Sequence, residues 1–270
     1  MPGSPSPVVV VADDFGLSPA VNAGILEAFQ RRLISATSLM ANMPEFDAAV
    51  AAARDRGLGD RLGVHLNLSE GPALSAEIRD CPRLSTPDGE LRWKHRNVWR
   101  LDATERRGIA AEWRAQLGKV RDAGVVPSHL DSHHHVHTAL AIGTIAITVA
   151  REFGVPTLRL SRNCGPDPGL AVRLYKRFFN GRIRSAGLSR MACFGSAHDV
   201  ASVLSSARGP IEVMTHPQLD ASGRLVNDRN GELLEPLIAA LGIADRMIGY
   251  RDLLASPGWG SSGSSGARSA

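Results

Sequence analysis

The chain has 270 residues, of which 43% are hydrophobic and 21% are charged, and it carries a formal net charge of +4. No apolar run approaches the roughly 20 residues of a membrane-spanning helix, and the modest charge without a nucleic-acid-binding motif argues against a nucleic-acid partner. Three widely spaced cysteines without a Cys-x-x-Cys pair argue against a disulfide framework or a cysteine zinc site, so we expect a reducing, cytoplasmic location.

The first predicted element is a strand at 8–12 that leads directly into two aspartates, Asp13 and Asp14. Its β-branched run indicates a strand buried on both faces, as in a parallel sheet. Adjacent buried carboxylates raise each other's pKa and need a partner, which a bound cation would supply. One aspartate could instead cap the following helix, but Ser18, followed by a proline, already provides that N-cap. We therefore expect both aspartates to be functional.

A second strand is predicted at 36–42, a helix at 46–56 and a third strand at 62–68. In the third strand His65 and Asn67 alternate with apolar residues, so both side chains face the same side. Because the carboxyl ends of strands form the site in α/β folds, His65 is a candidate metal ligand, with Asn67 as a supporting or substrate-binding residue. The alternative for His65 is a hydrogen-bonded core histidine.

The segment 71–100 is rich in proline, glycine and charge, and it predicts a long loop or small insertion that could cover the substrate. An apolar stripe over 109–120 predicts a long amphipathic helix, and a second helix is predicted to run through residue 150. A strand is predicted at 157–160, and its Arg159 is included among the supporting or substrate-binding candidates.

The most informative stretch is the histidine block at 129–137, which holds five of the nine histidines and one aspartate. Imidazole and carboxylate are the usual ligands of Zn²⁺ and similar divalent ions. A histidine tract can also be a surface metal scavenger. This one lies between a predicted strand and a predicted helix, and it has partners in the Asp-Asp pair and His65, which favours a metal site inside the fold.

Within this block the histidines are expected to differ in role. His133 is the candidate metal ligand, and Asp131 could accept a hydrogen bond that orients a metal-binding histidine. His137 lies four residues after His133, so the two would share a helix face if a helix begins there, with His137 as a supporting or substrate contact. His134 and His135 are expected to pack or to hydrogen-bond.

The last third of the chain contributes a basic segment and one more histidine. Between 173 and 190 there are six basic residues and no acidic ones. This pattern indicates either an ordinary basic amphipathic surface helix or a patch for an anionic partner, such as a phosphate-bearing or lipid-linked sugar or an anionic membrane surface. A strand at 211–215 ends at His216, which places His216 at the same edge of the sheet and favours a functional role over a turn residue. A helix is predicted at 233–241.

Strands and helices alternate, so we predict an α/β fold. The candidate residues run from Asp13 to His216, so no cut leaves a complete site on one side, and a single domain over 1–255 is expected. The Gly/Ser-rich segment 256–270 is expected to be a flexible tail.

Four motifs, in the same order, resemble those of the YdjC family of carbohydrate deacetylases. They are Ala-Asp-Asp-Phe-Gly-Leu-Ser at 12–18, Gly-Val-His-Leu at 63–66, the block at 129–137, and Glu-Val-Met-Thr-His-Pro at 212–217. The resemblance extends from about Val8 to about Tyr250, and it implies a distorted (β/α) barrel related to the NodB-type deacetylases. It also implies a hydrolase that removes the N-acetyl group of an amino sugar with one divalent metal ion, and a homodimer is expected on the same ground.

The resemblance implies that Asp14, His65 and His133 bind the metal ion and that Asp13 is the base, and we assign His216 as the acid that protonates the departing amine. The ion would activate a water and polarise the acetamide carbonyl, giving acetate and a free amino sugar. Zn²⁺, Co²⁺, Ni²⁺ and Mg²⁺ all remain candidates, and Mg²⁺ suits two imidazoles least. The substrate would be an oligosaccharide or glycoconjugate that contains N-acetylglucosamine.

Three alternatives stay open. The basic segment at 173–190 favours a phosphate- or lipid-linked amino sugar near a membrane over a neutral oligosaccharide. A non-haem iron oxygenase also uses two histidines and one carboxylate, but it leaves the Asp-Asp pair and His216 unexplained. A non-catalytic sugar-binding protein would not need every reactive group to be present.

Overall fold

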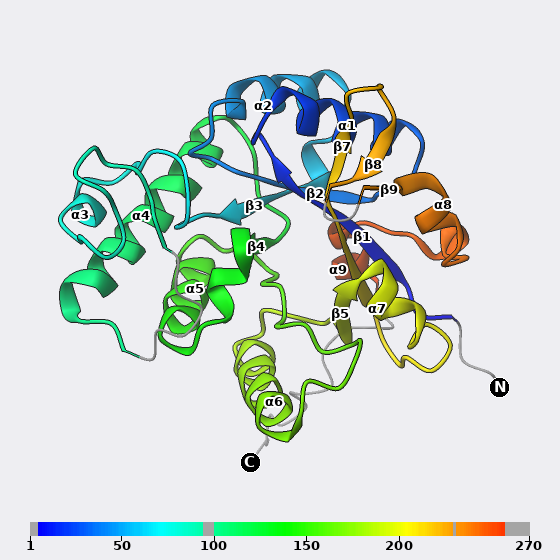
Figure 1. Cartoon of the computed structure of the whole chain (residues 1–270). Helices are drawn as coiled ribbons and strands as arrows, with labels where there is room; N and C mark the ends of the chain where they lie inside the picture. The colour runs from blue at the N-terminus through cyan, green and yellow to red at the C-terminus, as the bar shows by residue number, and fades with distance from the viewer. Residues whose placement is uncertain (1–4, 94–99, 229–230, 257–270) are drawn as a thin grey trace, which may run out of the picture.

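The computed structural model describes residues 5–93, 100–228 and 231–256. Its centre is a six-stranded sheet in which every neighbouring pair is parallel (Figure 1). The strand order is β4-β3-β2-β1-β6-β5. The strands are β1 (Val8–Phe15), β2 (Ala36–Leu39), β3 (Leu62–Leu66), β4 (Leu130–Ser132), β5 (Cys193–Ser196) and β6 (Ile211–Thr215).

Helices connect the strands and lie around the outside of the sheet (Figure 1). They are α1 (Pro19–Gln30), α2 (Phe46–Asp55), α3 (Ala76–Arg79), α4 (Ala103–Asp122), α5 (Leu140–Glu152), α6 (Leu170–Ser185), α7 (Ala197–Ala201), α8 (Leu234–Ala239) and α9 (Tyr250–Ala255), with short 3₁₀ helices η1 (Gly59–Arg61), η2 (His133–Thr138) and η3 (Ala244–Arg246). This alternation confirms the predicted α/β fold, and all eight residues of β1 are buried, as its β-branched run predicts.

The sheet curls into an incomplete barrel, and the segment 157–163 spans its two edges. The N–H of Arg159 donates to the carbonyl of Leu130 on β4 (2.9 Å), and the N–H of Asn163 donates to the carbonyl of Phe194 on β5 (3.2 Å). The strand predicted at 157–160 is reduced to a single parallel bridge between Leu130 and Leu158, because the chain leaves β4 after this contact to reach the opposite edge.

A small antiparallel sheet follows β6. It contains β7 (Pro217–Leu219), β8 (Leu225–Asn227) and β9 (Glu232–Leu233), in the order β7-β8-β9. β7 crosses α1 so closely that a Cβ on Gly24 would lie 2.4 Å from the Cα of Gln218, so only glycine fits there. This contact fixes the chain just after His216.

Several predicted boundaries differ from the structure for identifiable reasons. α4 begins at Ala103, earlier than the apolar stripe indicates, because Asp102 and Glu105 form a capping box that starts the helix. β3 ends at Leu66 because the N–H of Asn67 donates to the side-chain oxygen of Gln116 (2.9 Å) and leaves the ladder.

The segment predicted as a loop at 71–100 contains the short helix α3, and its residues 94–99 lie outside the described residues, as does most of the predicted tail at 256–270. Within the ranges that the structure describes, no helix is both long enough and apolar enough to cross a bilayer.

Candidate metal centre and active site

A bulge in β1 brings both aspartates to the same side of the sheet. The pairing of β1 with β2 shifts between Ala12 and Phe15, and Asp14 has a φ of 72°, in the left-handed region that non-glycine residues rarely adopt. Neighbouring residues on a regular strand point to opposite faces. Here both carboxylates face the interior at the carboxyl end of β1, and backbone strain of this kind concentrates at functional sites.

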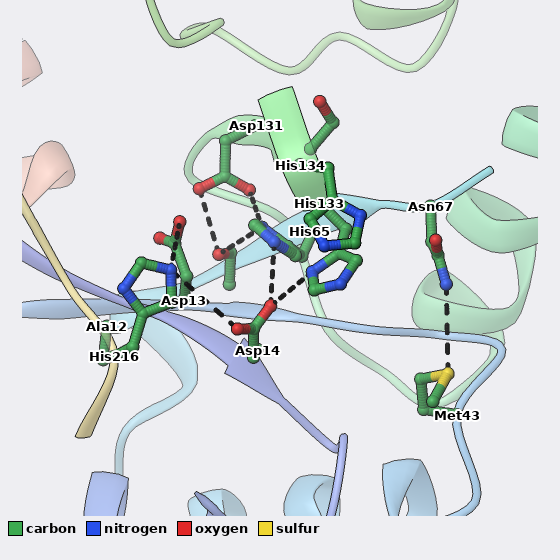
Figure 2. Close-up of polar contacts among 12 residues, drawn as sticks. Ala12, Asp13, Asp14, Met43, His65, Asn67, Asp131, His133, His134 and His216 are labelled. Carbon is green, nitrogen blue, oxygen red and sulfur yellow. Dashed lines mark hydrogen bonds and ion pairs between the residues drawn. The ribbon is translucent and has the colours of Figure 1, made fainter. Parts of the chain in front are cut away.

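Asp14 meets two histidines from neighbouring strand ends (Figure 2). Its Oδ1 lies 3.1 Å from Nε2 of His65, in β3, and 2.7 Å from Nδ1 of His133, directly after β4. Each of the three side chains offers one ligand atom, all within 4.8 Å of one another, and all three residues are buried. Two imidazoles and one carboxylate suit Zn²⁺ or a similar ion and leave positions for water and substrate. The residues therefore fit the implied divalent metal.

A second group, Asp13 with His65 and Asp131, also brings its ligand atoms within 4.8 Å. Arg159, however, pairs with both of its carboxylates at 2.7 Å. A cation there would face a buried guanidinium, so the group around Asp14 is the better candidate.

The ionisable side chains of this cluster strongly shift one another's pKa. Burial lowers the pKa of His65, but the charges of Asp131 and Asp13, with hydrogen bonds to Asp131 and Asp14, outweigh it and raise the pKa to about 10. Burial raises the pKa of Asp14, but hydrogen bonds from His133 and His65 hold it well below its usual range. The cluster thus favours an ionised carboxylate next to bound positive charge, and a metal ion would take the place of the protons on the rings.

Asp131 orients His65, as its position on the predicted strand suggested. Its Oδ1 accepts a hydrogen bond from Nδ1 of His65 (2.7 Å), and its Oδ2 accepts one from the hydroxyl of Ser38 (3.0 Å). This contact fixes the ring so that Nε2 points to Asp14, the arrangement found behind metal-binding histidines.

Arg159 holds the other aspartate. Its two terminal nitrogens donate to the two carboxylate oxygens of Asp13 at 2.7 Å each, one of them also contacts Asp131 (2.7 Å), and its Nε donates to Glu212. Arg159 is fully buried. Burial lowers its pKa, but Asp13, Asp131 and Glu212 outweigh that effect and raise it well above its usual range. The guanidinium therefore remains charged and fixes both oxygens of Asp13.

His216 lies on the other side of the aspartates (Figure 2). Its Nε2 is 3.9 Å from Oδ2 of Asp13 and 3.9 Å from Oδ2 of Asp14. Its own N–H donates to Oδ1 of Asn227 (2.9 Å), which anchors the turn between β6 and β7. The structure thus brings His216 to the site as expected.

The backbone of the histidine block bends sharply after His133. The 3₁₀ helix η2 begins at His133 but is interrupted at once, because His134 and His135 have positive φ values of 52° and 54°. His137 therefore turns inward, where Nδ1 contacts the Ser132 hydroxyl (2.5 Å), Nε2 lies 3.1 Å from the Arg159 carbonyl, and burial lowers its pKa to about 4.

His129, the first histidine of the block, is completely buried. His129 stacks on Tyr250 at 4.1 Å and lies so close to β3 that a Cβ on Gly63 would be 2.4 Å from its ring. Burial lowers the pKa of His129 to about 3, so this residue is a neutral core histidine.

Sequence reasoning missed Glu70. Its Oε1 lies 2.5 Å from Nε2 of His133, and hydrogen bonding to this ring lowers the pKa of Glu70. The Nδ2 of Asn67 donates to the Glu70 carbonyl (2.7 Å), so Asn67 shapes the loop that presents Glu70. A carboxylate in the loop directly after a site-forming strand was the available signal. Glu212 was missed as well, although a charged residue inside the buried strand β6 was visible in the sequence.

Comparisons with known proteins agree on one family. A family profile described as "YdjC-like protein" matches residues 7–237. A protein of Halalkalibacterium halodurans named carbohydrate deacetylase is 32% identical over 211 residues, which are 78% of this chain and 84% of the relative. A carbohydrate deacetylase of Brevibacillus brevis is 41% identical over 150 residues, 55% of this chain and 57% of the relative.

The fold also has a counterpart among solved structures. A crystal structure from Enterococcus faecalis V583, described as a "putative cellobiose-phosphate cleavage protein", superposes with a TM-score of 0.64 at 23% identity and covers 93% of this chain and 99% of that chain. This similarity shows that the two proteins share a fold.

Proposed function

The chain belongs to the YdjC-like family, and from this membership we propose that it is a metal-dependent carbohydrate deacetylase that hydrolyses the N-acetyl group of an amino sugar. The observation that carries the proposal is the meeting of Asp14, His65 and His133 beside a second aspartate that is fixed by a buried arginine. When bound, a divalent ion would polarise the acetamide carbonyl and lower the pKa of a water molecule.

In this proposal the two aspartates have different tasks. Asp14 holds the cation with the two histidines, and Asp13 accepts the proton of the water that attacks the acetamide carbon. Both oxygens of Asp13 already accept from Arg159, but each retains a lone pair for that proton. Arg159 thereby keeps the base in one orientation, and a fixed orientation is what makes proton transfer efficient.

His216 completes the reaction as the acid. Cleavage of the C–N bond leaves an amine that must gain a proton, because an amide anion is a poor leaving group. Nε2 of His216 is 3.9 Å from a carboxylate oxygen of each aspartate, which supports a role for His216 in the same reaction. One water and one acetamide thus give acetate and a free amino sugar.

The test is acetate release from N-acetylglucosamine, N-acetylated chitobiose, and phosphate- and lipid-linked forms of the same sugar, by the metal-loaded protein and its Asp13→Asn variant. Release by the unaltered protein and not by the variant supports the proposal. Absence of release from every sugar, with metal shown to be bound, would contradict it and favour a sugar-binding protein. The phosphate- or lipid-linked sugars are the second candidate class, which the basic face of α6 favours.

An iron oxygenase would use the same Asp14, His65 and His133 ligands. It would leave Asp13, fixed by Arg159, and His216 without a task, and the named relatives are deacetylases. Oxygen-independent acetate release separates the two proposals.

A further inference from the structure

Exposed apolar side chains are concentrated on one helix. Among the described residues, six large hydrophobic side chains are exposed, and four of them lie on α6: Leu170 (62% exposed), Val172 (44%), Leu174 (55%) and Phe178 (57%). Such residues are normal when scattered singly, but a contiguous group marks an interaction surface. We propose that α6 docks on the surface of an anionic lipid bilayer.

The exposed residues form a continuous row. Leu170, Leu174 and Phe178 are spaced four residues apart, so they follow one another along the outer side of the helix. The opposite side is anchored in the fold: Phe179 and Ile183 are fully buried. Phe179 fits against α5 so closely that a Cβ on Gly143 would lie 2.4 Å from its ring. The row is therefore presented outward by a helix that cannot turn it inward.

A row of arginines runs beside the apolar row. Arg173, Arg177 and Arg184 are exposed and lie on one flank at helical spacing. On the other flank the guanidinium of Arg182 lies 6.0 Å from the Phe178 ring. The helix contains no Asp or Glu, and the nearest acidic residue before it, Asp167, pairs with Arg173 (3.1 Å). The face of α6 is thus both apolar and strongly positive.

An apolar row beside a row of arginines fits an anionic bilayer better than it fits other partners. An interfacial helix buries its apolar side chains at the boundary of the acyl chains while its arginines contact anionic headgroups. A second copy of this chain would bring the same patch against itself in a two-fold interface and set the arginine rows near each other. A nucleic acid would match the charge but would leave the row of Leu170, Leu174 and Phe178 without an apolar partner.

The position of α6 relates the proposed docking to the candidate site. Leu158 bridges Leu130 in parallel, so the chain enters the loop before α6 at the carboxyl edge of the sheet, where Asp14 lies. α6 lies at the edge of the molecule (Figure 1), and the hydroxyl of Tyr175 on this helix donates to the carbonyl of Thr138, the last residue of η2, which begins at the candidate ligand His133. A docked α6 would bring the rim of the site close to the membrane; that consequence rests on the proposed function, whereas the docking itself does not.

The experiment is co-sedimentation of the full chain, loaded with metal, with vesicles of phosphatidylcholine alone or of equal parts phosphatidylcholine and phosphatidylglycerol. We expect binding to the anionic vesicles that weakens as salt is raised. Leu174→Gln/Phe178→Gln should abolish it, while Val126→Gln/Leu233→Gln, which alters the two large exposed hydrophobic residues that the described ranges have outside α6, should leave it unchanged.

Arg173→Gln/Arg177→Gln tests the charge, with Arg56→Gln/Arg208→Gln as a control of equal charge change at exposed positions. Binding should fall by about fivefold for each α6 arginine removed and stay the same in the control. Absence of binding by the unaltered chain, equal binding to neutral vesicles, or equal losses in the control variants would overturn the proposal.

Sedimentation velocity without vesicles tests whether α6 instead binds a second copy of this chain. A dimer that Leu174→Gln/Phe178→Gln converts to a monomer would overturn the proposal in favour of a second copy. Acetate release from a soluble N-acetyl sugar is measured in parallel and should be unaffected by these variants. Since vesicle binding is read without any turnover, its failure and a failure of the deacetylase proposal are distinguishable.

Discussion

Arg159 donates a 2.7 Å hydrogen bond from each of its two terminal nitrogens to a different carboxylate oxygen of Asp13. The same guanidinium contacts Asp131 and Glu212, and all four side chains are almost completely buried. Three carboxylates therefore share one positive charge in the interior. Because an unpaired buried charge is far more costly than an exposed one, this arginine supports both the fold and the orientation of the candidate base.

Arg159→Met is expected to lower the free energy of unfolding by about 3–5 kcal/mol, because it leaves buried carboxylates without their cation. The measurement is urea unfolding of the metal-loaded protein. The matched control is Arg114→Met, since the pair of Arg114 with Glu152 is exposed and should contribute less than about 1 kcal/mol. Arg159→Lys keeps a charge but loses the bidentate contact, so kcat should fall while metal content is retained. Equal losses in the Arg159→Met and Arg114→Met variants would contradict this view of the network.

Isosteric substitution should distinguish the roles of the two adjacent aspartates. Asp14→Asn removes a charged ligand and is expected to lose bound metal and activity together. Asp13→Asn should retain metal and lose kcat by about 10²–10⁴-fold, the range for removal of a general base. Metal content by plasma mass spectrometry, beside acetate release, makes the distinction. A metal-free Asp13→Asn variant would show that the ligand assignment must be exchanged.

The sequence predicts this pair but not its geometry. The β-branched run and the adjacent charges predict a buried strand that ends in a site. Strand periodicity would place Asp13 and Asp14 on opposite faces, and only the bulge at Asp14, with its positive φ, brings them together. That bulge depends on how β1 pairs with β2, which is a tertiary contact that local periodicity does not encode.

The same limit explains the supporting residues. Arg159 is a candidate on a predicted strand, but its partners Asp13 and Glu212 lie 146 and 53 residues away in the chain. Helical spacing suggested that His137 shares a face with His133, and this was wrong because the backbone kinks between them. Residue type and position at a strand end thus predicted which side chains gather as candidate metal ligands, while the contacts that hold them required the fold.

Metal binding should strengthen with pH over an unusually wide window. The pKa of His65 is raised to about 10 without metal: burial lowers it, but Asp131 and Asp13 outweigh that effect. A raised histidine pKa stabilises the metal-free fold fully below its unfolded value of about 6.5, and this stabilisation is lost as the pH rises towards 10. Metal must displace that proton, so the increase in Tm caused by metal should grow from pH 6 to pH 9.

An ordinary histidine would complete its titration near pH 7.5, so a metal-induced Tm increase that stops growing there would contradict this interpretation. Asp131→Asn serves as the comparison, because it removes the carboxylate that does most to raise the pKa of His65. In that variant, the pH range over which the metal-induced increase in Tm grows should move to lower pH. Differential scanning fluorimetry with and without metal measures both proteins.

Glu70 is expected to support His133. Its Oε1 lies 2.5 Å from the ring nitrogen that faces away from Asp14. Partners of this kind typically change metal affinity by about 10–100-fold. Glu70→Gln should therefore weaken metal binding in a competition titration with a chelator, while Glu77→Gln, an exposed carboxylate on α3, should not. Unchanged affinity in Glu70→Gln would leave Glu70 a role in contacting substrate only.

The role of His216 as an acid can be tested by changing the leaving group of the substrate. If it protonates the departing amine, its removal should matter for an amide and far less for an aryl acetate, whose phenolate leaves without a proton. His216→Ala is expected to lower kcat for an N-acetyl sugar by about 10²–10⁴-fold and to leave acetate release from p-nitrophenyl acetate, where the unaltered protein accepts it, within about tenfold. Equal losses on both substrates would show that His216 positions Asp13 and Asp14, 3.9 Å away, and is not the acid. Bound metal is measured in parallel, because a drop in metal content would mean that the residue acts on the metal centre.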